Sequence, residues 1–275
     1  MRALAVHENV IVVVSSVWQT TCTLVRGGGE GFVIDSPVLP DELDALTSIA
    51  EQAAFPVTGL LATHGDWDHL LGRIAFPEAS LGVGEATAAR IAAEPGAAQR
   101  ELRRFDERWY VDRTGRPLSL AAVQSLPVPG KVEIGAATGA GGSAANAEEI
   151  ELHPVPGHVA DAVALLLPSA QVLVCGDYLS PVEIPMICAE AGGDAFAYLE
   201  TLDRLEALVS RAATVVPGHG APLPADQART ILAEDRAYLD ALLAGHDAPL
   251  PGSRRSGAQR EIDARNRATL TPSDH

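Results

Sequence analysis

Short apolar segments that end in a histidine or an aspartate recur along this 275-residue chain. Each segment is rich in β-branched or other apolar residues, which is typical of a buried strand. The polar residues that follow them are His64 with His69, then His158, Asp177 and His219. In α/β sheets the ligand-binding crevice lies beyond the carboxyl ends of the strands, so we expect these side chains to converge there. This recurrence constrains the fold and the function more than any other feature of the chain.

The other segments predict that strands and helices alternate, which indicates an α/β fold. The predicted strands are 10–15, 20–25, 31–35, 58–63, 81–83, 150–155, 162–167, 172–175 and 214–216. The predicted helices are 40–55, 85–94, 100–110, 194–209 with Asp194 as the N-terminal cap, and 224–244. The Gly- and Ala-rich residues 135–146 predict a loop. We expect one domain over residues 1–248, followed by a polar tail or a peripheral helix over 249–275.

Composition excludes several classes of partner. The chain has 20 basic and 36 acidic residues, a formal net charge of -16, and Lys131 is its one lysine. Binding to nucleic acid or to an anionic membrane requires clustered basic residues, so we expect neither partner. No segment has the roughly 20 apolar residues of a membrane helix, and no signal peptide is recognisable. The cysteines are few and far apart, so we predict no disulfide framework and a cytoplasmic location.

The segment 64–69 concentrates metal-ligating residue types. It reads His64-Gly65-Asp66-Trp67-Asp68-His69, with two imidazoles and two carboxylates in close succession. Such a mixed nitrogen and oxygen set suits zinc, iron or manganese. Cysteine is missing from the set, which argues against a purely structural zinc site. The residues therefore predict a metal centre built from His and Asp.

The order and spacing of these residues resemble those of the metallo-β-lactamase fold superfamily. Its first motif, His-x-His-x-Asp-His, matches His64, Asp68 and His69, and the run that continues to Gly72 is similar to thioester hydrolases of the glyoxalase II type. The later motifs match Pro156-Gly157-His158, Gly176-Asp177 and Pro217-Gly218-His219, and Ile34-Asp35 resembles the strand-end aspartate that precedes the first motif. The resemblance implies a four-layer αββα sandwich with two divalent metal ions at one edge, zinc being the first expectation.

The resemblance also implies how the ligands divide. One metal would be bound by His64, Asp66 and His158. The other would be bound by Asp68, His69 and His219. Asp177 would bridge the two ions.

Asp66 departs from the motif, which usually has a second histidine there. A carboxylate oxygen still binds zinc, but it is a harder ligand and shifts the preference toward iron or manganese. The extra negative charge would make the metal cluster nearly neutral. We therefore expect weaker Lewis acidity of the metals, and a higher pKa of the water bound to them, than in relatives with a histidine at this position. Flavin-linked diiron oxygen reductases of the superfamily carry a Glu at this position, but 275 residues leave no room for their flavodoxin-like domain.

The predicted function is metal-dependent hydrolysis of a small carbonyl substrate, a thioester or a lactone. A hydroxide held between the metals would attack the carbonyl carbon, and Asp68 would orient it. Tyr178 is either a hydrogen-bond donor to the developing oxyanion or a packing residue. The alternatives are an iron-dependent oxidoreductase of the same fold and a metal-binding protein whose catalytic site is altered. The expected partner is a small molecule, and the sequence does not decide the oligomeric state.

Overall fold

Two β-sheets pack face to face in the computed structural model, which describes residues 1–135, 147–246 and 250–270. In spatial order the strands of the first sheet are β1 (Arg2–His7), β2 (Val10–Val14), β3 (Thr21–Gly27), β4 (Glu30–Asp35), β5 (Val57–Ala62), β6 (Ser80–Gly84) and β7 (Val123–Leu126). In spatial order the strands of the second sheet are β13 (Leu223–Pro224), β12 (Thr214–Val216), β11 (Val172–Val174), β10 (Val163–Leu167), β9 (Glu148–Pro154) and β8 (Gly130–Ile134).

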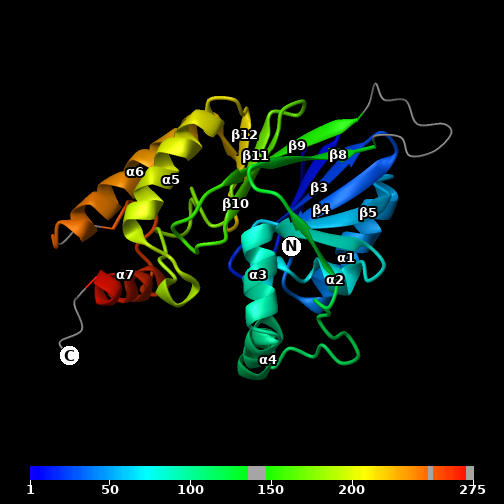
Figure 1. The fold of residues 1–275 in the computed structure, drawn as a ribbon, viewed down its shortest axis with the longest axis horizontal. Helices are drawn as coiled ribbons and strands as arrows, with labels where there is room; N and C mark the ends of the chain where they lie inside the picture. The colour runs from blue at the N-terminus through cyan, green and yellow to red at the C-terminus, as the bar shows by residue number, and fades with distance from the viewer. Residues whose placement is uncertain (136–146, 247–249, 271–275) are drawn as a thin grey trace.

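Helices cover the outer face of each sheet (Figure 1). The helices are α1 (Pro40–Gln52), α2 (Gly72–Ala75), α3 (Glu85–Ala93), α4 (Ala97–Trp109), α5 (Ala195–Val209), α6 (Ala225–Leu243) and α7 (Gly257–Leu270). Buried residues of α1 and α4 share a core with the first sheet, whereas those of α5, α6 and α7 share a core with the second. The predicted four-layer αββα sandwich is confirmed.

The apolar segments are continuous because their strands are buried on both faces. In β2, Val10, Val12 and Val14 point between the sheets, while Val13 points toward the helices. Strand β10 alternates in the same way, since Leu165 lies between the sheets and Leu166 faces the helices. Side chains of a strand alternate between its two faces, so a strand that is covered on both faces favours apolar residues along its whole length.

Parallel pairing brings several strand ends to one edge. Strands β4, β5, β6 and β7 pair in parallel with one another, and β11 runs parallel to β12. The connections between them pass through helices, as parallel pairing requires. The carboxyl ends of β11 and β12 therefore lie side by side, and the end of β5 in the other sheet meets them, because Gly176 after β11 lies against Thr63 after β5. The predicted ligands follow those ends.

Some elements differ from the prediction. Strands β1, β7 and β8 were not expected, because their residues are largely exposed or half-buried and form no apolar run. Asp194 caps α5 as predicted, since its carboxylate accepts a hydrogen bond from the Ala197 amide. Of the predicted loop, residues 136–146 lie outside the described part of the chain. The segment 249–275 contains helix α7, which packs on the second core through Ile262.

Candidate metal centre

The predicted ligands lie at the edge where the parallel strands end. Strand β5 leads into the segment 64–69, whose last residues form a short 3-10 helix (Trp67–His69). His158 follows β9, Asp177 follows β11, and His219 follows β12. Segments that are far apart in the sequence therefore contribute side chains to one cluster, as the recurrence of strand-end residues predicts.

The first group consists of His64, Asp66 and His158. Oδ2 of Asp66 lies 3.6 Å from Nε2 of His64 and 3.6 Å from Nε2 of His158. One ligand atom from each residue lies within 4.8 Å of the others. Both histidines are fully buried.

The second group consists of Asp68, His69 and His219. Oδ2 of Asp68 lies 3.7 Å from Nε2 of His69 and 3.7 Å from Nε2 of His219. Their ligand atoms also lie within 4.8 Å of one another. The two groups have the composition that the resemblance implies.

Asp177 lies between the two groups. Its Oδ2 is 3.8 Å from Nε2 of His64 and 3.3 Å from Nε2 of His158 in the first group. In the second group, its Oδ1 is 3.2 Å from Nε2 of His69, and its Oδ2 is 3.3 Å from Nε2 of His219. A carboxylate that faces all four imidazoles is placed where a bridging ligand would be.

Every imidazole of the cluster is oriented by a partner on its other nitrogen. His158 Nδ1 donates to the Met186 carbonyl at 2.8 Å, and His219 Nδ1 donates to the Trp18 carbonyl at 3.2 Å. His69 Nδ1 lies 3.0 Å from Oδ2 of Asp35, and His64 Nδ1 lies 3.0 Å from the hydroxyl of Thr63. Asp35, the strand-end aspartate of the resemblance, also accepts hydrogen bonds from Thr63. The hydrogen bonds at Nδ1 of His158 and His219 leave Nε2 as the atom that can bind a metal ion. Nδ1 of His69 faces Asp35 as an ion-pair contact, without an aligned hydrogen bond.

The cluster fits a metal ion on two counts. Within the described residues, Nε2 of His64, His69 and His158 is buried without a hydrogen-bond partner, and so is Oδ1 of Asp177. Buried polar atoms without partners are rare in folded proteins. Ligands held about 2.0–2.1 Å from a tetrahedral zinc lie about 3.3–3.4 Å apart, and the contacts around Asp177 are 3.2 to 3.8 Å long. These side chains are therefore spaced to surround cations.

Charge in the cluster also favours a cation. Burial lowers the pKa of His158, but Asp66 and Asp177 together raise it to about 9. Burial also lowers the pKa of His219, which Asp177 and Glu183 raise to about 10. The carboxylates respond in the opposite direction, because the surrounding imidazoles hold the pKa of Asp66 well below its usual range despite its burial. The carboxylates thus require positive charge beside them, which either protons or metal ions supply.

Two Pro-Gly-His turns place their histidines through close backbone packing. Gly157 has φ +142° and lies against the backbone of Tyr198, with which a Cβ would collide. Gly218 lies against Oδ1 of Asp177, so a side chain there would displace the Asp177 carboxylate. Glycine is required at both positions because nothing larger fits.

Arg90 of α3 is part of the centre and was not predicted. Its Nη2 donates to Oδ1 of Asp66 at 2.7 Å, and its Nη1 donates to Oδ1 of Asp161 at 2.9 Å. The signal in the sequence was Asp66 itself, because a partly buried carboxylate is stabilised by a cationic or hydrogen-bonding partner. The expectation of a nearly neutral cluster left out this guanidinium.

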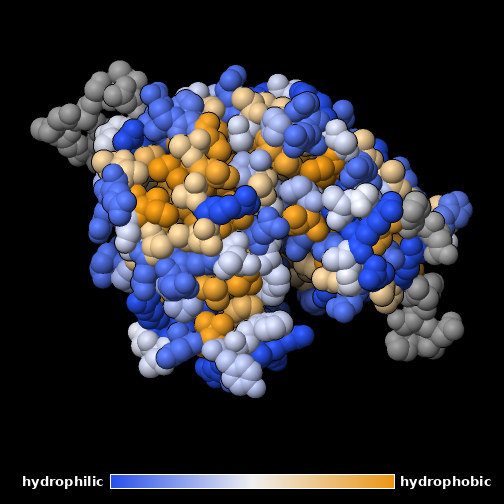
Figure 2. All heavy atoms as spheres, turned by 180° about the vertical axis from the view of Figure 1, so that it is seen from behind, coloured by the Kyte–Doolittle hydropathy of each residue, from blue (hydrophilic) through white to orange (hydrophobic). Residues whose placement is uncertain are grey.

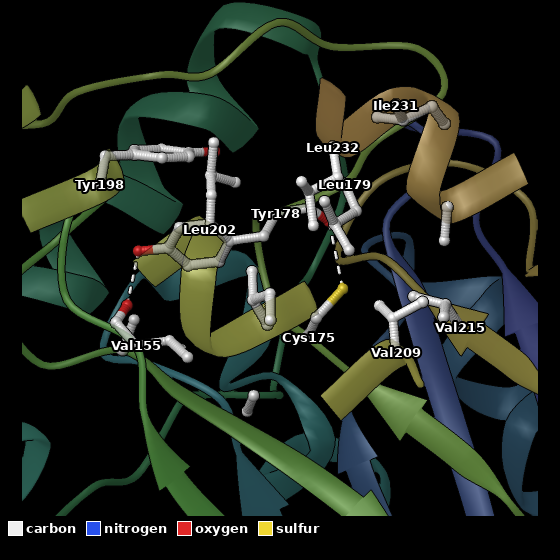
Figure 3. Packing of buried hydrophobic residues seen from close by; sticks show 14 of the residues in the cluster. Val155, Cys175, Tyr178, Leu179, Tyr198, Leu202, Val209, Val215, Ile231 and Leu232 are labelled. Atoms are coloured by element: carbon white, nitrogen blue, oxygen red, sulfur yellow. Dashed lines mark hydrogen bonds between the residues drawn. The ribbon is translucent and has the colours of Figure 1, made fainter. Parts of the chain in front are cut away.

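Tyr178, the predicted oxyanion donor, lies in the core and is not among the residues that line the cavity. Its side chain is fully buried, and its hydroxyl donates to the Val155 carbonyl (Figure 3). The same oxygen accepts a hydrogen bond from the His158 amide at 2.8 Å. The ring packs against Tyr198 with centroids 4.6 Å apart. Tyr178 is therefore the packing residue that the sequence allowed as the other possibility, and it supports the turn that carries His158.

A cavity of about 1620 Å³ opens beside the cluster and is lined by Asp66, Asp68 and His219 on one side. Figure 2 shows the surface hollowed at its lower edge, between the lobe that carries α4 and the lobe that carries α7. Trp18 and Trp67 form an aromatic wall, with ring centroids 5.8 Å apart. The cluster is thus accessible to a ligand larger than water.

The C-terminal helix holds the loop at the other side of the cavity. Gln259 of α7 accepts a hydrogen bond from the Ile184 amide at 2.7 Å, and Asn266 accepts one from the Ile187 amide at 3.0 Å. This loop includes Met186, whose carbonyl orients His158. Helix α7 is therefore connected to a predicted metal ligand through a single loop.

Within the described residues, no helix is long and apolar enough to span a membrane.

Comparisons with known proteins agree with the fold. A metallo-beta-lactamase family protein from Thermus thermophilus has a TM-score of 0.65 and 23% sequence identity, covering 89% of this chain and 85% of that protein. The sec-alkylsulfatase Pisa1 from Pseudomonas sp. has a TM-score of 0.68 and 16% identity over 98% of this chain, which spans 49% of the sulfatase. The DIM-1 metallo-beta-lactamase has a TM-score of 0.56 and 16% identity, covering 84% and 95% of the two chains. These identities are evidence for the fold alone.

No curated protein matches the chain. The family model of the metallo-beta-lactamase superfamily matches residues 15–219, which include every residue of the cluster described above. Since this match covers most of the chain, the protein belongs to the metallo-beta-lactamase superfamily.

Proposed function

We propose that the protein binds two divalent metal ions, with zinc as the first candidate, and hydrolyses a small carbonyl substrate. The observation that carries the proposal is the position of Asp177, whose carboxylate faces the Nε2 atoms of four buried histidines. Two groups of three ligands with a shared carboxylate are the donor set that a pair of metal ions requires. When bound, such ions lower the pKa of a water molecule and polarise a carbonyl oxygen.

The residues of this chain supply orientation and a proton acceptor. The partners of Nδ1 keep each imidazole turned toward the centre, so that little rearrangement accompanies metal binding. Asp68 lines the cavity, and its Oδ2 lies between His69 and His219. From this position Oδ2 can accept a proton from a water molecule that enters from the cavity. Asp68 thus combines a ligand role with the orientation of the attacking water.

The cavity supports a substrate with an apolar part. Trp18 is 46% exposed beside the cluster, and Phe105 backs the wall at 5.4 Å from the Trp18 ring centre. An aromatic wall beside a polar reaction centre suits an acyl group attached to the carbonyl under attack. We therefore propose a thioester or a lactone as the substrate class. The structural neighbours that are named as lactamases and as an alkylsulfatase support hydrolysis as the type of reaction.

The test combines metal content with a substrate panel. Elemental analysis of the purified protein should find two divalent ions per chain, and thioesters or lactones should be hydrolysed in preference to phosphoesters. Asp68→Ala should abolish turnover without unfolding the protein. His153→Ala is the matched control, because His153 pairs with Glu151 outside the cluster. Full activity in Asp68→Ala would refute the assigned role.

An iron-dependent oxidoreductase is the second candidate, and the carboxylate of Asp66 is the observation that favours it. A hard oxygen donor in place of a nitrogen donor shifts metal preference toward iron. Iron accompanied by an optical band, and no hydrolysis of any ester in the panel, would favour this candidate over the hydrolase.

A further inference from the structure

We propose that Arg90 is a positioning residue that adapts the metal centre to an aspartate at the place where the superfamily motif has a histidine. Its guanidinium binds one oxygen of Asp66 and leaves the other oxygen directed at the metal site. The inference rests on the proposed metal binding. It concerns how the first ligand group, which contains His64, Asp66 and His158, is held.

The two oxygens of Asp66 face different partners. Oδ1 accepts the hydrogen bond from Nη2 of Arg90 at 2.7 Å, whereas Oδ2 is the atom 3.6 Å from Nε2 of both His64 and His158. A carboxylate with two free oxygens binds a metal through either oxygen or through both. With Oδ1 occupied, Asp66 offers a single donor atom, as an imidazole does. The arginine thus gives the carboxylate the ligand number of the histidine that it replaces.

Arg90 is itself fixed in place by a second acid. Nη1 donates to Oδ1 of Asp161 at 2.9 Å, and Oδ2 of Asp161 accepts a hydrogen bond from the Gly65 amide at 3.0 Å. The Thr87 hydroxyl donates to the Asp161 carbonyl at 3.1 Å. These bonds join α3 to the segment before Asp66 and to the segment after His158. The position of the carboxylate is therefore defined relative to both histidines of its group.

The arrangement also separates Arg90 from a role in substrate binding. Arg90 lines the cavity, but its two terminal nitrogens already donate to carboxylates. Its positive charge is therefore largely neutralised by Asp66 and Asp161, which leaves little attraction for an anionic substrate. Because Asp161 pairs with the same guanidinium, Arg90 acts on the position of the Asp66 carboxylate rather than on the net charge of the site.

The experiment measures metal binding in a double-mutant cycle. Apo-protein is titrated with Co²⁺ and with Zn²⁺ for the unsubstituted chain, Arg90→Met, Asp66→His and the double variant. Arg90→Met should weaken binding of one of the two metal ions by about 10- to 100-fold, the range typical of residues that orient a ligand. Its Co²⁺ absorption should lose intensity, because a second Asp66 oxygen raises the coordination number. The metal affinity of Arg90→Lys should lie between those of the unsubstituted protein and of Arg90→Met, since one ammonium group cannot hold both acids in the same geometry.

In the Asp66→His background, Arg90→Met should leave metal affinity unchanged or raise it, because the guanidinium no longer has a carboxylate to position. Arg103→Met is the matched control, since Arg103 is exposed on the neighbouring helix α4. An equal loss of affinity in both backgrounds would show a merely structural role and overturn the inference. Unchanged affinity and an unchanged Co²⁺ spectrum in Arg90→Met would also overturn it. If the unsubstituted protein binds no metal, the proposed function itself fails, which is a separate result.

Discussion

Replacing Asn266 with Ala should loosen the loop that orients His158. Asn266 is fully buried on α7, where it accepts from the Ile187 amide at 3.0 Å and donates to the Pro185 carbonyl at 2.6 Å. Both partners are buried, and a buried backbone group without a hydrogen bond costs about 1–3 kcal/mol. The loss of both bonds should lower the free energy of unfolding by about 2–6 kcal/mol. Met186, which lies between the two partners, provides the carbonyl oxygen that accepts the hydrogen bond from His158.

The assay is urea unfolding of the metal-free protein at constant pH, followed by zinc titration. Arg265→Ala is the control, because Arg265 is exposed on the same helix and should change stability by no more than about 0.5 kcal/mol. Zinc affinity of Asn266→Ala should fall by about 10-fold, since the loop that orients His158, a predicted metal ligand, has become mobile. The reasoning is refuted if Asn266→Ala unfolds at the same urea concentration as the control and binds zinc as tightly.

Three further substitutions test other parts of the structure. Arg254→Met leaves Asp235, a buried carboxylate of α6, without its cation, and the free energy of unfolding should fall by about 3–5 kcal/mol in thermal unfolding. A decrease of less than about 1 kcal/mol would contradict this. Asp35→Asn weakens the support of His69 and should reduce zinc affinity by about 10-fold or more in titrations. Hydrogen bonds from Arg211 lower the pKa of Glu151 to about 2. The ion pair therefore stabilises the fold fully above pH 4.5, the ordinary pKa of Glu, and this stabilisation is lost as the pH falls from 4.5 to about 2. Arg211→Ala should reduce this loss of stability in acid, in unfolding measured against pH, by no more than about 1 kcal/mol because Arg211 is partly exposed; the smaller contribution of His153 should remain.

Elements that are buried on one or both faces could be predicted from the sequence. Helix α5 is an example, because its cap, Asp194, and its buried leucines, such as Leu202 and Leu205, are all local signals. The exposed edge strand β1 and the polar helix α7 could not be recognised in the same way. Their stability comes from strand pairing and from side-chain hydrogen bonds to a distant loop, which leave no periodic apolar pattern.

The residues of the candidate site also divide into those that local sequence signals identify and those that only tertiary contacts identify. The strand-end histidines were identified because residue type and position relative to an apolar segment are both local properties. The two roles allowed for Tyr178 could not be separated from the sequence, since position after a strand does not say whether a hydroxyl points to a cavity or donates to a buried carbonyl such as that of Val155. Arg90 was missed because its partner, Asp66, is separated from it by a strand and two helices.

By itself, the residue pattern determined the alternation of strands and helices and the side chains offered to a metal, because apolar segments and ligand chemistry are local properties; the layered sandwich followed from the resemblance to the superfamily. Only the tertiary structure decided which oxygen of Asp66 faces the centre, that Asp177 lies between two groups of ligands, and that α7 holds the loop behind His158. Those features depend on distances between segments that are remote in the chain. Hydrogen-bond and ion-pair partners are selected by such distances, and composition and spacing do not contain them.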